Sequence, residues 1–342
     1  MTKLIQAICL VLLIPACGGG GGSSSTSTTS TYTSSGSVGE VLSYAIDTTN
    51  KTYSYTVLKS AYNLTGTTGS GTLTSNTDGS YTPSENSNAR IYNISGGLIV
   101  GSAYLNLSGS TYTSVPFVGV NSPVTTLSTL AGTYNYLGFS CTSPTTGTIS
   151  YTNCSTPYGT IKIDSSGSYT TCASTNITTS TTCSTTSGTI SYLSSGIWKF
   201  TRTGSTASNY LLAYDGGSSQ VVLIIDTNDS GGYGYGHFVG STQTAIDSSG
   251  SLGSYYFSSN NGSAGTATPT STGYSAAYTN SGTSYTESGS VTYNSPWNGL
   301  VTVTPSGSAS TNTAIIAGTG LYALRSNVAN STYYSVGMKT SN

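Results

Sequence analysis

Apolar and polar residues alternate with a period of two along most of the chain after residue 40. The stretch 41–58, VLSYAIDTTNKTYSYTVL, places Tyr53, Tyr55 and Val57 on one side of an extended backbone. Such alternation is typical of a β-strand with one buried face. No long stretch keeps the period of an amphipathic helix, so parallel crossovers are not expected. We therefore predict an all-β protein made of antiparallel strands.

Two short segments of the chain are closely similar. Residues 71–82 read GTLTSNTDGSYT, and residues 159–170 read GTIKIDSSGSYT. A weaker copy, GTATPTSTGYSA, begins at Gly265. Each segment is typical of a strand, a turn rich in Asp, Ser and Gly, and a return strand. The alternative is coincidence in a chain of low complexity.

Further short matches keep the same order along the chain. FVG occurs at 117–119 and 238–240, and SVG occurs at 335–337. Units this small are marginally stable alone, so we expect them to pack together. The sequence thus predicts tandem antiparallel β units, either small barrels or sandwiches, over 39–120, 130–240 and 251–338.

The first residues have the pattern of an export signal. Lys3 provides a positive charge, and the apolar run 4–14 is too short to span a bilayer. Cys17 follows small Ala16 and is itself followed by a Gly/Ser/Thr-rich stretch. This composition cannot bury enough apolar surface to fold. We expect a signal peptide over 1–16 and a disordered linker over 17–38.

Ile14, Pro15, Ala16 and Cys17 together resemble the lipobox of a Gram-negative bacterial lipoprotein. The resemblance implies cleavage before Cys17, diacylglycerol on its sulfur and acylation, such as palmitate, of the new N-terminus. Two or more acyl chains anchor a protein stably in a lipid bilayer. Gly18 in place of Asp implies sorting to the outer membrane, on either its periplasmic or its cell-surface face. The alternative is an ordinary secretory signal with a chance cysteine.

Charged residues make up 6% of the chain, and the formal net charge is −1. Loss of Lys3 with the signal takes that charge from −1 to −2. The remaining basic residues are scattered and form no patch. Nucleic-acid binding needs clustered Lys and Arg to neutralise phosphates, so we expect no nucleic-acid partner.

Four cysteines remain after Cys9 in the signal and Cys17 are set aside. In an exported protein an even number of cysteines predicts disulfides. Three connectivities are possible, and the local pairs Cys141–Cys154 and Cys172–Cys183 are favoured because each brackets one loop-rich excursion. A zinc site is the alternative, but no Cys-x-x-Cys occurs among them.

One segment resembles the start of a calcium-binding loop. Asp226, Asn228 and Ser230 alternate and are followed by a glycine, which turns oxygen ligands inward. The twelfth position holds His237 where a bidentate Glu would close the shell. Calcium is therefore the one cofactor considered, and the alternative is an Asx-type turn that ends the strand.

Three functions remain open. The anchor and the β-rich body resemble the surface lipoproteins of Gram-negative bacteria, which implies a non-enzymatic binding or structural role with a protein or glycan partner. A lipocalin-like carrier of a small apolar ligand is the first alternative, because Gly132-Thr133-Tyr134 is similar to the Gly-x-Trp opening of that family. An exported hydrolase is the second, but His237 is the only histidine and no Gly-x-Ser-x-Gly occurs.

Tyrosine and tryptophan complete the list of candidates. The chain has 28 tyrosines but only 5 phenylalanines. Tyrosine suits half-buried strands as well as protein and sugar contacts, so the abundance alone does not locate a site. Trp198 and Trp297 each follow a turn, and we expect both in the cores of their units.

Overall fold

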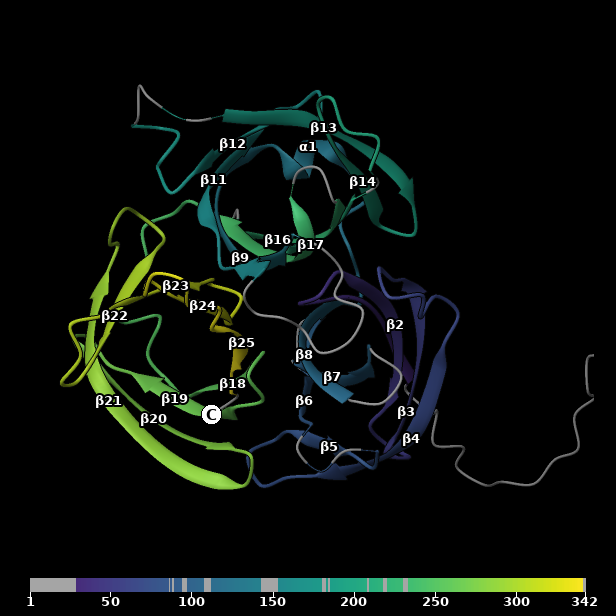
Figure 1. The fold of residues 1–342 in the computed structure, drawn as a ribbon, viewed down its shortest axis with the longest axis vertical. Coiled ribbons are helices and arrows are strands. Elements are labelled where there is room, and N and C mark those ends of the chain that lie inside the picture. The colour runs from purple at the N-terminus through teal and green to yellow at the C-terminus, as the bar shows by residue number, and fades with distance from the viewer. Residues whose placement is uncertain are drawn as a thin grey trace, which may run out of the picture.

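The structure is a computed structural model of the whole chain. It describes residues 29–85, 87, 89–93, 97–107, 112–142, 153–179, 183, 185–207, 209–217, 220–229 and 233–340. Over these residues the chain forms three antiparallel barrels in tandem, which lie side by side in a triangle (Figure 1). The predicted all-β fold of tandem antiparallel units is confirmed, and the units are barrels.

The first barrel closes because its first strand pairs with both its second and its last. β1 lies antiparallel to β2 on one side and to β8 on the other, with Ser35 opposite Val41 and Val118. The strands are β1 (Thr29–Gly36), β2 (Glu40–Asp47), β3 (Thr52–Lys59), β4 (Thr68–Ser75), β5 (Tyr81–Pro83), β6 (Ile91–Asn93), β7 (Leu98–Asn106) and β8 (Tyr112–Val120).

β1 corrects the prediction of a disordered linker over 17–38, since Thr29–Gly36 is a strand of the first barrel. Ser34 and Ser35 are fully buried there, and Tyr32 is 3% exposed. Composition argued for disorder because small polar side chains bury little apolar surface. Here the backbone N–H and C=O groups of β1 form hydrogen bonds with those of β2 and β8. Neither β2 nor β8 is therefore left with an unpaired edge.

The second barrel closes where β9 meets β17, with Leu137 opposite Val239. The short β10 pairs with the end of β9 and leads into β11, so the two together follow β9 around the wall. The strands are β9 (Gly132–Cys141), β10 (Cys154–Ser155), β11 (Tyr158–Ile163), β12 (Ser168–Ala173), β13 (Thr185–Ser194), β14 (Ile197–Arg202), β15 (Asn209–Asp215), β16 (Val221–Asp229) and β17 (Gly234–Thr242).

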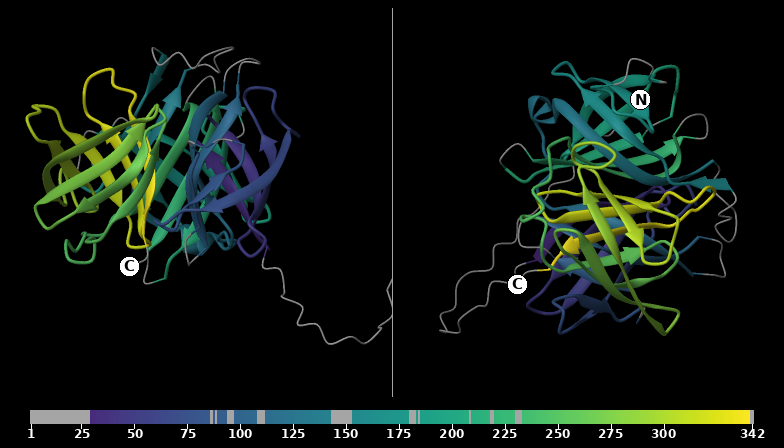
Figure 2. Two further views of the ribbon diagram at one scale, coloured as in Figure 1. Left: turned by 90° about the horizontal axis from the view of Figure 1, so that it is seen from below. Right: turned by 90° about the vertical axis from the view of Figure 1, so that its left-hand side faces the viewer.

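The third barrel closes between β18 and β25, with Phe257 opposite Gly337. The strands are β18 (Tyr255–Ser259), β19 (Ala264–Pro269), β20 (Gly273–Asn280), β21 (Thr283–Tyr293), β22 (Val301–Pro305), β23 (Asn312–Ile316), β24 (Leu321–Ser326) and β25 (Tyr334–Lys339). The views from the side show the strands of all three barrels running along the same general direction (Figure 2).

The helix found in the described residues is α1 (Leu127–Leu130), in the connection between the first two barrels. A single turn of this length has no N-cap side-chain bond and is held by buried Leu130. Within the described ranges, no helix has the length and apolar character that crossing a membrane would require.

The short repeated segments fall into two groups. The FVG and SVG segments lie in β8, β17 and β25, which are the last strands of the three barrels. GTIKIDSSGSYT and the copy from Gly265 form the hairpins β11–β12 and β19–β20, near the start of their barrels. GTLTSNTDGSYT forms β4–β5, further along its barrel. The segment GTLTSNTDGSYT is therefore a hairpin of the same length as GTIKIDSSGSYT, but it lies at a different position in its barrel.

Glycine and tyrosine are abundant partly because they pair across strands. Tyr169 lies opposite Gly188, and Tyr274 lies opposite Gly289. A Cβ atom at either glycine would overlap the tyrosine ring, which lies flat over the backbone there. An aromatic ring that covers a glycine shields backbone and fills the missing side chain's space.

The two tryptophans have different environments. Trp198 is 3% exposed and donates from Nε1 to the carbonyl of Val124 at 2.8 Å, within the second barrel. Trp297 lies outside the core of the third barrel, so that prediction is wrong. Its ring stacks on Tyr158 with centroids 5.8 Å apart, and Nε1 donates to Asn135 Oδ1 at 2.7 Å. Trp297 thus ties the third barrel to the second.

Candidate functional site

The interior of the third barrel holds a cavity of about 400 Å³. It is lined by alternate residues of β20 and β21, as the two-residue period of strands requires. β20 contributes Tyr274, Ala276 and Tyr278, and β21 contributes Tyr285 and Glu287. The residues between them on these strands, such as exposed Ala277, face away.

Four side chains of β20 and β21 form one wall of this cavity. Tyr278 and Tyr285 are opposite in the register and stack with ring centroids 5.4 Å apart. The Tyr274 hydroxyl donates a hydrogen bond to Glu287 Oε1. Burial raises the pKa of Tyr274, and the neighbouring Glu287 carboxylate raises it further. The phenol therefore remains a hydrogen-bond donor at neutral pH.

Glu287 faces more than one phenol. Its negative charge contributes, after burial, to the raised pKa of Tyr278. It also contributes, after burial, to raising the pKa of Tyr333 to about 12. The described residues that line this cavity include no Lys, Arg or His. The cavity is thus an aromatic cup that contains one carboxylate and no basic side chain from the described part of the wall.

The interior of the second barrel differs. Its core contains fully or nearly fully buried rings, among them Tyr134 and Trp198. A smaller cavity of about 320 Å³ remains, lined by aromatic residues and by Arg202. The Arg202 guanidinium lies 5.8 Å from the ring centroid of Tyr233, which is cation–π distance. Here the chain places its own cation among its own aromatic rings.

The first barrel has a cavity of about 570 Å³ that is lined by tyrosines and by Glu85. Burial raises the pKa of Tyr53, and the Glu85 carboxylate raises it further. The described residues lining this cavity again include no basic side chain. The first and third barrels therefore share the combination of phenols and one glutamate.

A buried polar cluster joins the first barrel to the second. Ser35 of β1 donates from Oγ to Asp226 Oδ2 at 2.9 Å. Ser35 Oγ lies 3.0 Å from His237 Nδ1, and all three residues are at most 1% exposed. The serine hydrogen goes to the carboxylate, so Nδ1–H donates to the serine oxygen. Burial raises the pKa of Asp226 to about 7 and lowers the pKa of His237 to about 3.

This cluster has the residue types of a hydrolytic triad without its connectivity. In such a triad the histidine lies between the serine and the acid, takes the serine proton and is oriented by the acid. Here Ser35 lies between Asp226 and His237 and donates its proton to the carboxylate. The arrangement holds two barrels together and offers no activated nucleophile.

Glu40 is the other acidic group of this interface. It is fully buried, and Ser60 Oγ donates to its Oε1 at 3.1 Å. Burial raises the pKa of Glu40 to about 9, with a further contribution from the charge of Asp226. The carboxyl is therefore protonated at neutral pH in the folded protein.

The structure places the calcium candidates in a strand. β16 continues through Asp226 and Asn228 to Asp229, so the turn expected to begin at 226 is absent. Asn228 Nδ2 donates to Asp226 Oδ1 at 2.9 Å, which leaves both carboxylate oxygens hydrogen-bonded within the protein. Ser230 lies outside the described residues. Among those residues, no group of three or more His, Cys, Asp or Glu has metal-site geometry.

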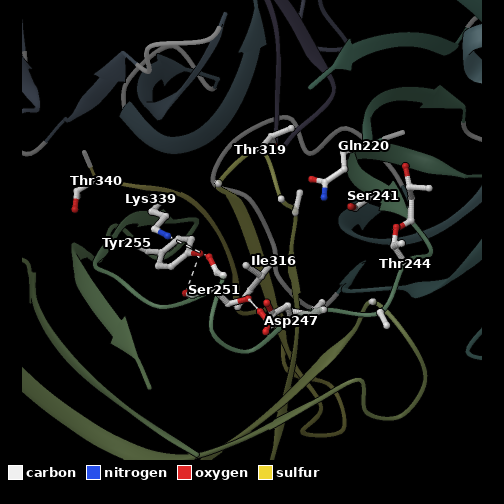
Figure 3. A pocket seen from close by; sticks show the side chains of 18 of the residues that line it. Gln220, Ser241, Thr244, Asp247, Ser251, Tyr255, Ile316, Thr319, Lys339 and Thr340 are labelled. Atoms are coloured by element: carbon white, nitrogen blue, oxygen red, sulfur yellow. Dashed lines mark hydrogen bonds between the residues drawn. The ribbon is translucent and has the colours of Figure 1, made fainter. Parts of the chain in front are cut away.

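A further cavity, of about 740 Å³, lies where the three barrels meet. Figure 3 shows Tyr255, Ser251 and Lys339 on one side, with Gln220 and Thr244 across from them. Lys339 Nζ donates to the Gly250 carbonyl at 3.2 Å, and Tyr255 donates to the Ser251 carbonyl at 3.1 Å. These two bonds hold the loop 246–251 against the third barrel.

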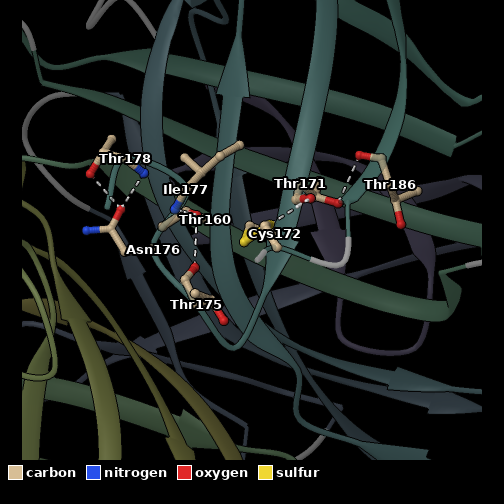
Figure 4. Close-up of a disulfide and its surroundings, with 9 residues drawn as sticks. Thr160, Thr171, Cys172, Thr175, Asn176, Ile177, Thr178 and Thr186 are labelled. Atoms are coloured by element: carbon tan, nitrogen blue, oxygen red, sulfur yellow. Dashed lines mark hydrogen bonds between the residues drawn. A yellow bond between two sulfur atoms is a disulfide. The ribbon is translucent and has the colours of Figure 1, made fainter. Parts of the chain in front are cut away.

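Both disulfides in the structure join the local pairs that the sequence favours. Cys141–Cys154 connects β9 to β10, and Cys172–Cys183 links β12 to the chain ahead of β13. Thr160 lies beside the second bridge (Figure 4) and accepts from the Ile177 N–H at 2.8 Å. Both bridges restrain long excursions of the second barrel.

The sequence and the structure do not cover the same candidate residues. Cys17, the predicted lipidation site, lies outside the described residues. The cup residues of the third barrel were not singled out from the sequence. Their signal was present as alternation in the segment GYSAAYTN, with Tyr274 and Tyr278 four residues apart. Glu287 belongs to the next strand, and the pairing of β20 with β21, which sets Glu287 opposite Ala276, brings it to the same cavity.

Comparison with known proteins adds limited information. No protein-family model matches the chain, and no curated protein matches it. Two similar solved structures are transferrin-binding protein B of Haemophilus parasuis Hp5, as a double mutant, and that of serogroup B Neisseria meningitidis. Identities are 8% and 10%, and TM-scores are 0.29 and 0.27. The alignments cover 88% and 89% of this chain and 65% and 66% of those chains.

This chain therefore spans less than two thirds of the length of either solved chain. At these TM-scores the likeness carries no conclusion about function.

Proposed function

We propose that this protein is a non-enzymatic binding protein of the bacterial envelope and that its ligand enters the third barrel. The cavity of about 400 Å³ in that barrel is the observation that supports the proposal. A closed strand wall holds the lining residues in fixed positions, which lowers the cost of ordering them on binding.

The lining favours a ligand with polar as well as apolar parts. Tyr255, Tyr278 and Tyr322 offer ring faces, whereas Glu287 and Asn312 offer polar groups inside the same cavity. An apolar ligand of the lipocalin kind would desolvate the Glu287 carboxylate without supplying a counter-charge. The binding role is therefore preferred over the carrier of an apolar ligand.

The lipid anchor is part of the same proposal. Acylated Cys17 would hold the body at the outer membrane, and the chain between Cys17 and Thr29 would act as a short tether. A Cys17→Ser variant should then move from the membrane fraction to the soluble fraction. Sedimentation of that variant with membranes would contradict the anchor without affecting the cavity.

The binding role can be tested by filling the cavity. Ala276→Trp places a large ring inside the third barrel, and Ala277→Trp places the same ring on its outer surface. The full chain and both variants are purified in non-ionic detergent, immobilised and exposed to the small-molecule fraction of an envelope extract. Mass spectrometry then identifies the retained compounds.

We expect the wild type and Ala277→Trp to retain a compound that Ala276→Trp loses. If no retained compound depends on the interior position, the third barrel is not a binding site. Both variants add the same side-chain volume, so they differ only in where the ring lies. Circular dichroism of the two shows whether either substitution impairs folding.

A further inference from the structure

The third barrel contains a cup with a built-in negative charge. Tyr274 and Ala276 of β20 lie opposite Gly289 and Glu287 of β21 in the strand register. Small Gly289 thus lies opposite the Tyr274 ring, and small Ala276 lies opposite the Glu287 carboxylate. This arrangement leaves open space beside Glu287, whose Oε1 accepts from the Tyr274 hydroxyl.

Aromatic rings surround that space on several sides. Tyr278 stacks on Tyr285, and Phe257 meets Tyr278 edge-on with ring centroids 6.0 Å apart. Tyr322 lines the same cavity from β24. Ring faces attract cations through their quadrupole, most strongly where water is displaced.

The charge of the cup has no internal counter-ion in the part of the wall that is described. The lining residues include Glu287 but no Lys, Arg or His. Half-buried carboxylates are normally paired with a cation or exposed to water. A ligand that brings one positive charge into the cup would satisfy the carboxylate and the rings together.

The second barrel shows what such a ring cluster accepts. There the Arg202 guanidinium lies 5.8 Å from the centroid of Tyr233 and lines the cavity with Phe200 and Phe238. That cup is supplied with a cation by the chain itself. The cup of the third barrel has the rings and adds a carboxylate, but no basic residue of the described wall fills it.

We infer that the third barrel binds ligands through an organic ammonium group. The ammonium contacts the faces of Tyr278 and Tyr285 and pairs with Glu287, whose orientation Tyr274 fixes. This inference rests on the proposed binding function and specifies the chemical class of its ligand.

Isothermal titration calorimetry with choline chloride tests this inference on the full chain in non-ionic detergent. The matched probe is the neutral isostere of choline, in which a quaternary carbon replaces the nitrogen. We expect choline to bind and the isostere to bind at least about tenfold more weakly, because shape is shared and only charge differs. Equal binding of both probes would overturn the inference.

Two charge-matched variants locate the site. Glu287→Gln keeps an acceptor for Tyr274 but removes the charge, and we expect choline affinity to fall about tenfold. Glu85→Gln removes the corresponding charge from the first barrel, where Glu85 is exposed to solvent and not half-buried as Glu287 is, and should leave a site of wild-type affinity. Unchanged affinity in Glu287→Gln would place the site elsewhere and refute the inference.

Tyr285→Leu is a second test that does not touch the carboxylate. Tyr285 is 46% exposed at the rim, so its loss should not impair folding. We expect affinity to fall about fivefold through the lost ring face. A compound lost only by Ala276→Trp, together with no choline binding, would leave the binding function standing and refute the ammonium class.

Discussion

The second and third barrels share a closed antiparallel wall but differ in what fills it. The second barrel buries Tyr134, Tyr169 and Phe200 almost completely. The buried interior cluster of the third barrel consists of smaller side chains, Val291, Val301, Val303, Ala314 and Leu324. The volume of the inward-facing residues therefore affects how much of the interior stays open, about 320 Å³ in the second barrel and about 400 Å³ in the third.

On the proposed function, stability and binding are divided between these barrels. The second barrel has dense packing, two disulfides and an internal cation–π contact between Arg202 and Tyr233. The third barrel has no disulfide in its described residues, and all its lining tyrosines except Tyr255 are partly or largely exposed. Side chains that fill a barrel stabilise it but leave no room for a ligand. A densely packed second barrel beside a more open third barrel therefore suits a binding protein.

The largest expected effect compares one leucine from each interior. Leu211 is fully buried in the core of the second barrel, whereas Leu324 borders the cavity of the third. We expect Leu211→Ala to lower the free energy of unfolding by about 3–5 kcal/mol and Leu324→Ala by about 2 kcal/mol or less. Urea denaturation measures both, and equal losses would contradict the distinction between core and cup.

The next effect concerns the polar interface that joins the second barrel to the first. The Glu40 pKa is raised to about 9, so its contribution to stability is lost as pH rises from about 4.5 towards 9. Asp226, with its pKa raised to about 7, acts in the same direction. His237, with its pKa lowered to about 3, acts oppositely, because stability is lost as pH falls below its usual value of 6.5.

Glu40→Gln tests this linkage because glutamine cannot ionise. At pH 7 the variant should be more stable than the wild type by up to about 3 kcal/mol, and at pH 5 the difference should nearly vanish. Calorimetric Tm values at the two pH values measure the change. A difference that does not depend on pH would show that the pKa of Glu40 is not raised in the folded protein.

The smallest expected effect comes from the disulfides of the second barrel. The Cys172–Cys183 bridge closes a sequence separation of 11 residues. Loop-closure entropy gives about 2–3 kcal/mol for a loop of this length. A Cys172→Ser, Cys183→Ser double variant should lower the unfolding temperature of the second barrel and leave the third unchanged. Equal shifts in both barrels would mean that they unfold as one unit.

Local patterns were sufficient for several features of this protein. Alternation in segments such as 41–58 determined strands, and the spacing of Cys141 to Cys154 and of Cys172 to Cys183 indicated local disulfides. Both depend on neighbours within a few residues or one loop. The scarcity of charge likewise follows from composition alone.

Tertiary structure decided the rest, because closure of a barrel pairs residues that are distant in sequence. The composition of Thr29–Gly36 is typical of a linker. The segment is a strand because β8, more than seventy-five residues later, provides its second hydrogen-bonding partner. Ser35 meets Asp226 across a separation of 191 residues. Glu287 and Tyr322 come to face one cavity only when β18 meets β25. Sequence fixes which way a side chain points along its strand, but closure fixes what it faces.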